Sequence, residues 1–141
     1  MNAATPAEKG AAAPAHEARS RARLAALQAL YQLEITGLGP DEVIEEFIEH
    51  RFARDEEAGV ASAYDKVFFS DLVRGVLKHQ MEIDSSVAKS LDSGWTLARI
   101  DSILRALLRA AVYELVARRD VPAKVVIDEY VELARDFFEG D

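Results

Sequence analysis

The stretch "WTLARIDSILRALLRAAVYELVARRD" (Trp95–Asp120) decides the fold class of this chain. Its apolar residues recur at spacings of three and four, which is the period of an amphipathic α-helix. The resulting stripe consists of Leu97, Ile100, Leu104, Leu107, Leu108, Ala111 and Leu115. Ile103 and Val112 widen it, so we expect a central helix that is buried on much of its circumference. Thr96 is placed to cap the amino end of this helix, since a threonine hydroxyl can accept a hydrogen bond from a first-turn amide.

Helical periodicity extends outward from this segment in both directions. The remaining helices are expected over residues 17–35, 41–52, 63–79, 82–91 and from Pro122 onward. Gly37 fits a helix carboxyl cap, Pro40 restarts a helix, and residues 53–62 are expected to form a polar loop. Gly75 costs about 1 kcal/mol inside a helix relative to alanine, so we expect a second helix to approach closely there. No segment alternates apolar and polar residues as a half-buried strand does. The sequence therefore predicts an all-α fold, a compact helical bundle of six helices.

Charge is distributed unevenly along the chain, whose net charge is −8. Residues 41–66 hold nine acids against three bases, whereas residues 99–124 hold six bases against three acids. Arg19, Arg21 and Arg23 also stand within five residues at the start of the first expected helix. A protein with this pattern can bind an anion on one face and repel it elsewhere. The charge therefore argues against indiscriminate nucleic-acid binding and allows a local anion site.

Composition excludes several classes of function. The 141 residues contain no cysteine, which excludes disulfides, thiolate metal sites and cysteine nucleophiles. The sequence has no apolar run near the roughly 18 residues of a membrane helix, and no phosphate loop, dinucleotide fingerprint or nucleophile motif. We expect a cytoplasmic protein that is not an enzyme and needs no cofactor or metal. Residues 1–15 are expected to form a mobile tail and residues 16–141 the folded domain.

Four segments, taken together, resemble a known family. They are "ARSRARLAALQALYQLE" (residues 18–34), "FFSDLVRGV" (68–76), "IDSILRALLRAAVYEL" (100–115) and "DVPAKVVIDEYVELARDFF" (120–138). Each one alone is largely helix periodicity. In this order and spacing they resemble the NusB family of bacterial transcription antitermination factors, over nearly the whole chain except the tail.

The resemblance implies an all-helical RNA-binding protein. NusB-like proteins pair with NusE, a small-subunit ribosomal protein, and bind the single-stranded boxA element of nascent ribosomal transcripts. Together they help assemble an antitermination complex on RNA polymerase. The family's arginine-rich amino-terminal segment supports RNA binding, and Arg19, Arg21 and Arg23 occupy it here. Ser20 stands where some relatives carry a further arginine, and Asp128 replaces an asparagine common in the last motif.

Elementary electrostatics agrees with phosphate binding by these arginines. The amides at a helix start and nearby guanidinium groups favour the same ligand, an anion. Arg19 and Arg23 are four residues apart and share a helix face, whereas Arg21 points away from it. Gln28 and Lys124 are further candidates for RNA contact.

Other interpretations of these residues stay open. The arginines could form an ordinary solvated face. Tyr31 could belong to the core, although its position makes contact with a partner protein a second interpretation. Trp95 is expected to anchor packing rather than to stack on a base. The chain could also resemble the NusB-like domain that precedes the catalytic domain of some ribosomal-RNA cytosine methyltransferases, or it could be a helical protein–protein adaptor.

The carboxyl end departs from the family pattern. NusB-like chains usually continue past a segment like "LARDFF" (residues 133–138) into a last helix, whereas this sequence stops at Asp141. We expect apolar surface to be exposed where that helix would pack. Three interpretations stay open: lower stability, self-association as a homodimer, or a shortened version of a longer chain.

Overall fold

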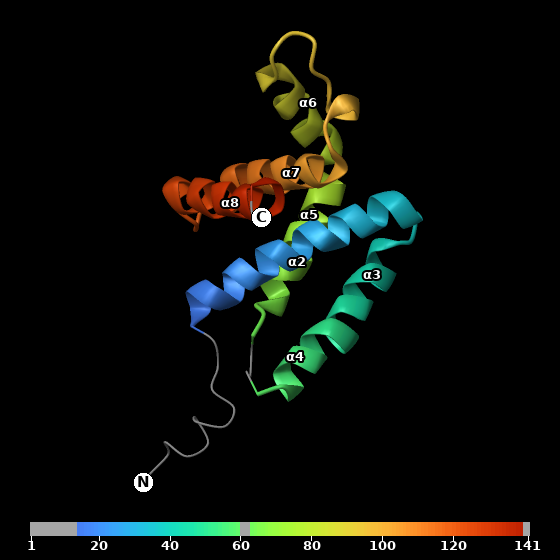
Figure 1. The fold of residues 1–141 in the computed structure, drawn as a ribbon, viewed down its shortest axis with the longest axis vertical. Coiled ribbons are helices and arrows are strands. Elements are labelled where there is room, and N and C mark those ends of the chain that lie inside the picture. The colour runs from blue at the N-terminus through green and yellow to red at the C-terminus, as the bar shows by residue number, and fades with distance from the viewer. Residues whose placement is uncertain (1–13, 60–62, 140–141) are drawn as a thin grey trace. The chain divides into compact units, whose positions relative to one another are not determined.

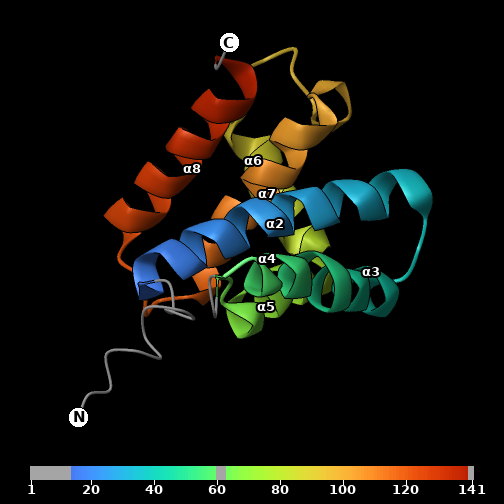
Figure 2. The same ribbon diagram turned by 60° about the horizontal axis from the view of Figure 1, so that its bottom comes forward.

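The regular elements of this protein are helices throughout the part of the chain that the computed structural model describes, residues 14–59 and 63–139 (Figures 1 and 2). In order they are α2 (Ala15–Thr36), α3 (Pro40–Glu46), η1 (Phe47–Phe52), α4 (Ala53–Glu57), α5 (Lys66–Lys78), α6 (Gln80–Ser90), η2 (Leu97–Arg99), α7 (Ser102–Ala117) and α8 (Ala123–Phe138). Because α3, η1 and α4 follow one another without a break, the predicted all-α fold of six helices is confirmed. The tail expected over residues 1–15 lies almost wholly outside the described residues.

The chain divides into two compact units, residues 1–71 and residues 72–141. The amino-terminal unit contains α2, the continuous α3–η1–α4 helix and the first turns of α5. In this unit α2 packs against α3. The carboxyl-terminal unit contains the rest of α5 with α6, η2, α7 and α8, and in it α7 packs against both α6 and α8 (Figure 1).

Aromatic rings and small side chains form the core of the amino-terminal unit. Four buried alanines of α2 allow its neighbours to approach closely: Ala22, Ala25, Ala26 and Ala29. The ring of Phe52 meets Phe69 edge to face and stacks on Tyr64, with ring centroids 4.9 and 3.9 Å apart. Phe47 completes this cluster, 5.5 Å from Phe69. Leu27 and Leu30 of α2 are buried, whereas Ile35, near the end of the same helix, is 59% exposed and lies outside this core.

The helix that starts at Pro40 is longer than its sequence pattern predicts. Gly37 closes α2 with a φ of 76°, and Pro40 lies in the first turn of α3, both as expected. The predicted loop over residues 53–62 is wrong in its first half, because α4 carries the helix on to Glu57. Between α3 and α4, η1 is a π-helix. In a π-helix the backbone hydrogen bonds join residues five apart, which brings their side chains to the same side of the helix. Phe47 and Phe52 are both buried for this reason.

The amino end of α7 differs from the prediction. Asp101, not Thr96, caps this helix, and its Oδ1 accepts a hydrogen bond of 2.8 Å from the backbone amide of Ile103. Thr96 instead precedes the short η2 turn and makes no side-chain cap bond. The buried face of α7 consists of Ala106, Leu107, Ala110, Tyr113 and Glu114. The predicted stripe is therefore only partly right, since Leu115 is 41% exposed.

Close helix packing at Gly75 is confirmed. A Cβ atom at this position of α5 would overlap the ring of Tyr113 on α7. The glycine therefore makes room for a buried tyrosine, which offsets its low helix propensity.

The last described helix, α8, has one buried face and one exposed apolar face. Val126, Tyr130 and Leu133 are buried, whereas Phe137, one turn after Leu133, is more than a third exposed. The exposed apolar residues of α7 and α8 are Leu115, Val116, Val125, Ile127, Val131, Phe137 and Phe138. Apolar surface is thus exposed on α7 and α8.

Candidate nucleic-acid interface

The three arginines of the amino-terminal segment lie on the first turns of α2 and have different surroundings. Arg21 is exposed to solvent, and among the described residues no hydrogen bond or ion pair is found for its side chain. Arg19 is about one third exposed, and its Nε lies 3.4 Å from Oδ2 of Asp65. Arg23 is only 1% exposed. Arg21 is therefore the arginine best placed to meet an external phosphate.

The other two arginines, Arg19 and Arg23, both contact the aromatic ring of Phe68. The guanidinium carbon of Arg19 lies 4.5 Å from the centroid of its ring and that of Arg23 lies 5.0 Å away. Such cation–π contacts stabilise a guanidinium by about 0.5–2 kcal/mol, more when it is removed from water. The shared face of Arg19 and Arg23, with Arg21 turned away, is as predicted. A direct RNA contact by Arg23 stays a prediction, and its buried guanidinium would have to be uncovered to make one.

Asp65 is a residue of this site that sequence reasoning missed. Its Oδ1 accepts a hydrogen bond of 3.0 Å from the amide of Phe68, which caps the start of α5. Its own amide donates to the carbonyl oxygen of Ala18 at 3.1 Å, and its Oδ2 faces Arg19. Asp65 therefore fixes the start of α5 against the start of α2. A signal for Asp65 was present in the sequence, because an aspartate three residues before Phe68 is typical of a helix amino-terminal cap.

Gln28 and Tyr31 lie further along α2 and are both partly buried. The Oε1 of Gln28 accepts a hydrogen bond from Nη1 of Arg51 on η1. Gln28 is thus held by a neighbouring helix, and its RNA contact stays a prediction, as does a partner contact by Tyr31.

Lys124 belongs to the carboxyl-terminal unit, near the start of α8. Its side chain is exposed, and its Nζ donates a hydrogen bond of 2.8 Å to Oδ2 of Asp128, one helical turn away. This hydrogen bond raises the pKa of Lys124 above its ordinary value of 10.5. The lysine is therefore a cation at neutral pH, but its charge is already balanced in part by Asp128. Contact of Lys124 with RNA stays a prediction.

Trp95 does not anchor packing, because it is 58% exposed, so the expectation from the sequence is wrong. It follows α6 in a loop that Gly94 turns with a φ of 93°. Together with Leu91, Ile100, Leu104 and Leu108 it lines a cavity of about 640 Å3. The tryptophan stays outside the core because α7 starts only at Ser102, beyond the η2 turn.

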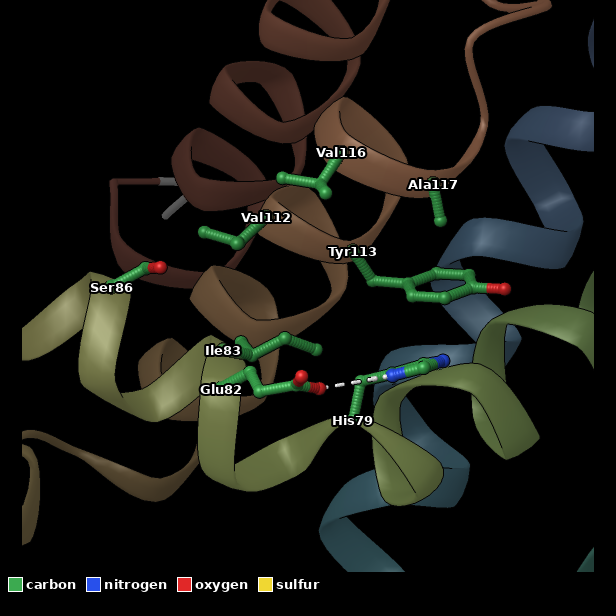
Figure 3. Close-up of a pocket in the computed structure, with 8 residues that line it drawn as sticks. All are labelled: His79, Glu82, Ile83, Ser86, Val112, Tyr113, Val116 and Ala117. Carbon is green, nitrogen blue, oxygen red and sulfur yellow. Dashed lines mark hydrogen bonds and ion pairs between the residues drawn. The ribbon is translucent and has the colours of Figure 1, made fainter.

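An apolar pocket between α6 and α7 carries one polar pair (Figure 3). The Nδ1 of His79 lies 3.1 Å from Oε1 of Glu82, and its ring stacks on Tyr113 with centroids 6.3 Å apart. Ser86 lies at the opposite end of this pocket from His79 (Figure 3). The three side chains therefore do not form the nucleophile–base–acid chain of a hydrolase. Among the residues that the structure describes, no group of three or more side chains could hold a metal ion.

Similarity to known proteins extends over most of the chain. The NusB family model matches residues 20–141. The chain is 57% identical over 122 residues to the transcription antitermination protein NusB of Caulobacter vibrioides, and the match covers 86% of this chain and 82% of that protein. It is 30% identical to the solved NusB structure of T. maritima, with a TM-score of 0.60 and coverage of 89% and 80% of the two chains. A chain in a crystal structure of a plectonemic RNA supercoil is 26% identical, with a TM-score of 0.70 and coverage of 86% and 82%. No helix in the described ranges is long and apolar enough to cross a membrane.

Proposed function

Since this chain belongs to the NusB family of transcription antitermination proteins, we propose that it binds boxA-type single-stranded RNA together with NusE. It is an RNA-binding transcription antitermination factor, and the observation that carries this function is the 57% identity to a NusB protein over most of both chains. In the proposed role it acts in the cytoplasm, without catalysis, on nascent ribosomal transcripts. There it helps to assemble the antitermination complex on RNA polymerase.

The exposed guanidinium of Arg21 supports the RNA-binding part of the proposal. It lies on the second turn of α2 and is exposed to solvent, so an external phosphate can reach it. Arg19 stands one turn away from Arg23 and is a second, partly exposed cation. Two or three phosphate contacts of this kind give modest affinity, so a partner such as NusE is needed for tight binding.

Titration of boxA RNA with the full chain, with and without NusE and over a range of salt concentrations, tests the proposal. Each phosphate contact to a single strand contributes about −0.7 to the slope of log affinity against log salt. Arg21→Ala is expected to flatten that slope by about 0.7. Arg119→Ala removes the same charge from an exposed position in the other unit and serves as the matched control. Arg23→Ala is a poor test, because a buried guanidinium also stabilises the fold.

Two results would contradict the proposal. Equal salt-dependence slopes for Arg21→Ala and the unchanged protein would show that Arg21 does not contact an RNA phosphate. Failure to bind boxA RNA at any salt concentration, with NusE present, would favour a protein–protein adaptor instead.

A further inference from the structure

The ion pair between Arg19 and Asp65 joins the first turns of α2 to the start of α5. The Nε of Arg19 donates to Oδ2 of Asp65 over 3.4 Å. Hydrogen bonds between a guanidinium and a carboxylate are ordinarily about 2.7–2.9 Å long, so this contact is a weak one. Both side chains are about one third exposed. Solvent reaches the pair, and an RNA phosphate can therefore reach it too.

The two oxygen atoms of the Asp65 carboxylate have separate partners. Oδ1 accepts the hydrogen bond from the Phe68 amide that caps α5, whereas Oδ2 faces Arg19. The backbone amide of Asp65 donates to the carbonyl oxygen of Ala18, independently of both. Loss of the Arg19 contact would therefore leave the cap and the backbone contact with α2 in place. An RNA phosphate can replace Asp65 at Arg19 without unfolding the start of α5.

The ring of Phe68 positions Arg19 independently of Asp65. The guanidinium carbon of Arg19 lies 4.5 Å from the centroid of this ring, a cation–π contact that does not involve the carboxylate. Arg23 contacts the same ring, but its side chain is buried. Of the two arginines at Phe68, Arg19 is thus the one that RNA can reach.

An open cavity borders Asp65 at the starts of α2 and α5 and the end of α4. Its volume is about 400 Å3, and its charged lining residues are Glu56, Asp65 and Lys66. Glu56 and Lys66 pair with each other, with Nζ 3.1 Å from Oε2. Asp65 therefore borders open space as well as Arg19, and its carboxylate is close to any phosphate that contacts the same guanidinium.

Asp65 opposes the binding of a phosphate to Arg19 in two ways. Its carboxylate balances part of the charge of Arg19, and it also repels a second anion at the same guanidinium. Both effects weaken RNA binding. Because the pair is exposed, the effect is modest, since exposed ion pairs shift an equilibrium by up to about fivefold.

We propose that Asp65 is a positioning residue that lowers the affinity of this chain for single-stranded RNA by competing with the RNA phosphates for Arg19. The proposal rests on the proposed function, because it needs the chain to bind RNA. It assigns the first phosphate contact to Arg21. Arg19 contributes fully only when RNA displaces Asp65 from it.

Asp65→Asn tests the proposal in a titration of boxA RNA with the full chain and NusE. Asparagine keeps an oxygen for the α5 cap and caps helices about as well as aspartate, but it carries no charge. We expect Asp65→Asn to bind RNA about two- to fivefold more tightly than the unchanged protein at low salt. The slope of log affinity against log salt should also become steeper, by up to about 0.7, because Arg19 becomes available to one more phosphate.

Two comparisons separate this effect from a change in net charge or in folding. Asp101→Asn makes the same chemical change at the aspartate that caps α7 in the other unit, and it should leave RNA affinity and slope unchanged. The double variant Asp65→Asn/Arg19→Ala should bind no more tightly than Arg19→Ala alone, because the gain acts through Arg19. Urea unfolding of each variant checks that the cap survives. Asp65→Ser, which also caps without a charge, serves as a second variant.

Several outcomes would overturn the proposal. Unchanged or weaker RNA binding by Asp65→Asn would show that the carboxylate does not compete for Arg19. A gain that persists without Arg19, or an equal gain for Asp101→Asn, would assign the effect to charge alone. Loss of folding in both Asp65→Asn and Asp65→Ser would make the role of Asp65 a structural one.

Failure of the proposed function is distinguishable from these outcomes. If the unchanged protein with NusE binds no boxA RNA, the proposed function itself is wrong. Arg21→Ala and its salt series test that function without any change at Asp65.

Discussion

The hydroxyl of Tyr130 on α8 donates a hydrogen bond of 2.8 Å to Oε1 of Glu114 on α7, and both side chains are buried. A buried carboxylate is costly unless it is hydrogen-bonded, so this contact compensates part of the cost of enclosing Glu114. It also fixes the register between the two helices, because a displacement of one turn would separate the groups.

Removal of the hydroxyl in Tyr130→Phe should lower the free energy of unfolding by about 1–3 kcal/mol at neutral pH. The cost arises because the Glu114 carboxylate loses a donor that water cannot replace. Urea denaturation measures the effect. Tyr31→Phe removes the same atom from a partly exposed position, and its effect should stay below about 0.5 kcal/mol. Equal effects for the two variants would show that the buried bond contributes nothing specific.

Gly75→Ala should destabilise the protein by about 1–3 kcal/mol, although alanine is the better helix former. The added methyl group would overlap the ring of Tyr113, so that one of the two helices must move. A double-mutant cycle with Tyr113→Leu checks the cause. The double variant should be more stable than the sum of the single changes predicts. Strict additivity would place the strain elsewhere.

Asp101→Ala should cost about 0.5–2 kcal/mol, because the first turn of α7 loses its cap. Thr96→Ala should have an effect below about 0.5 kcal/mol, since its hydroxyl makes no cap bond. Thermal unfolding of both variants distinguishes the two residues. A larger loss for Thr96→Ala would mean that the helix starts where the sequence pattern placed it.

Alkaline pH should destabilise the protein through Tyr64. Burial raises the pKa of Tyr64 above its ordinary value of 10.0, and its hydrogen bond of 2.7 Å to Asp55 raises it further. The folded state therefore keeps a proton that the unfolded chain loses near pH 10. Stability from this group is complete below that pH and decreases as the pH rises toward the folded-state pKa.

Tyr64→Phe isolates this contribution. The variant should lose about 1 kcal/mol at neutral pH with the hydrogen bond, and its stability should decrease less steeply above pH 10 than that of the unchanged protein. Urea denaturation from pH 8 to pH 11 measures both. Parallel curves over that range would mean that Tyr64 titrates alike in the folded and unfolded states.

Helix positions could be predicted from the sequence because apolar spacing is a local property. Pro40 and Gly37 mark ends correctly, since their backbone preferences do not depend on the rest of the chain. Trp95 and Thr96 were misplaced because the 3₁₀ turn of η2 contains apolar residues in a spacing that continues that of α7. The spacing of apolar residues cannot distinguish a helix from a preceding turn whose apolar residues continue the same spacing.

The candidate site was less predictable, because its charges find their partners through the fold. Arg19 and Arg23 were expected to act together, and they do share a face, but that face is directed at Phe68. The Nη1 of Arg105 likewise donates to the carbonyl oxygens of Leu97 and Ile100, which helix spacing alone does not indicate. Spacing indicates which side chains lie together on a helix. It does not indicate which neighbour they meet.

Because η1 is a π-helix, the number of residues in this segment determines how the following helix is rotated about its axis. Its wide turn accommodates one residue more than an α-helix would, and everything after it is rotated accordingly. Deletion of a single residue there would return α4 to the phase of α3 and swing Phe52 and Arg54 by about 100° around the axis. Substitutions within residues 47–52 do not change the number of residues and therefore leave that rotation unchanged. Insertions and deletions should therefore be far less tolerated in this segment than exchanges of side chain.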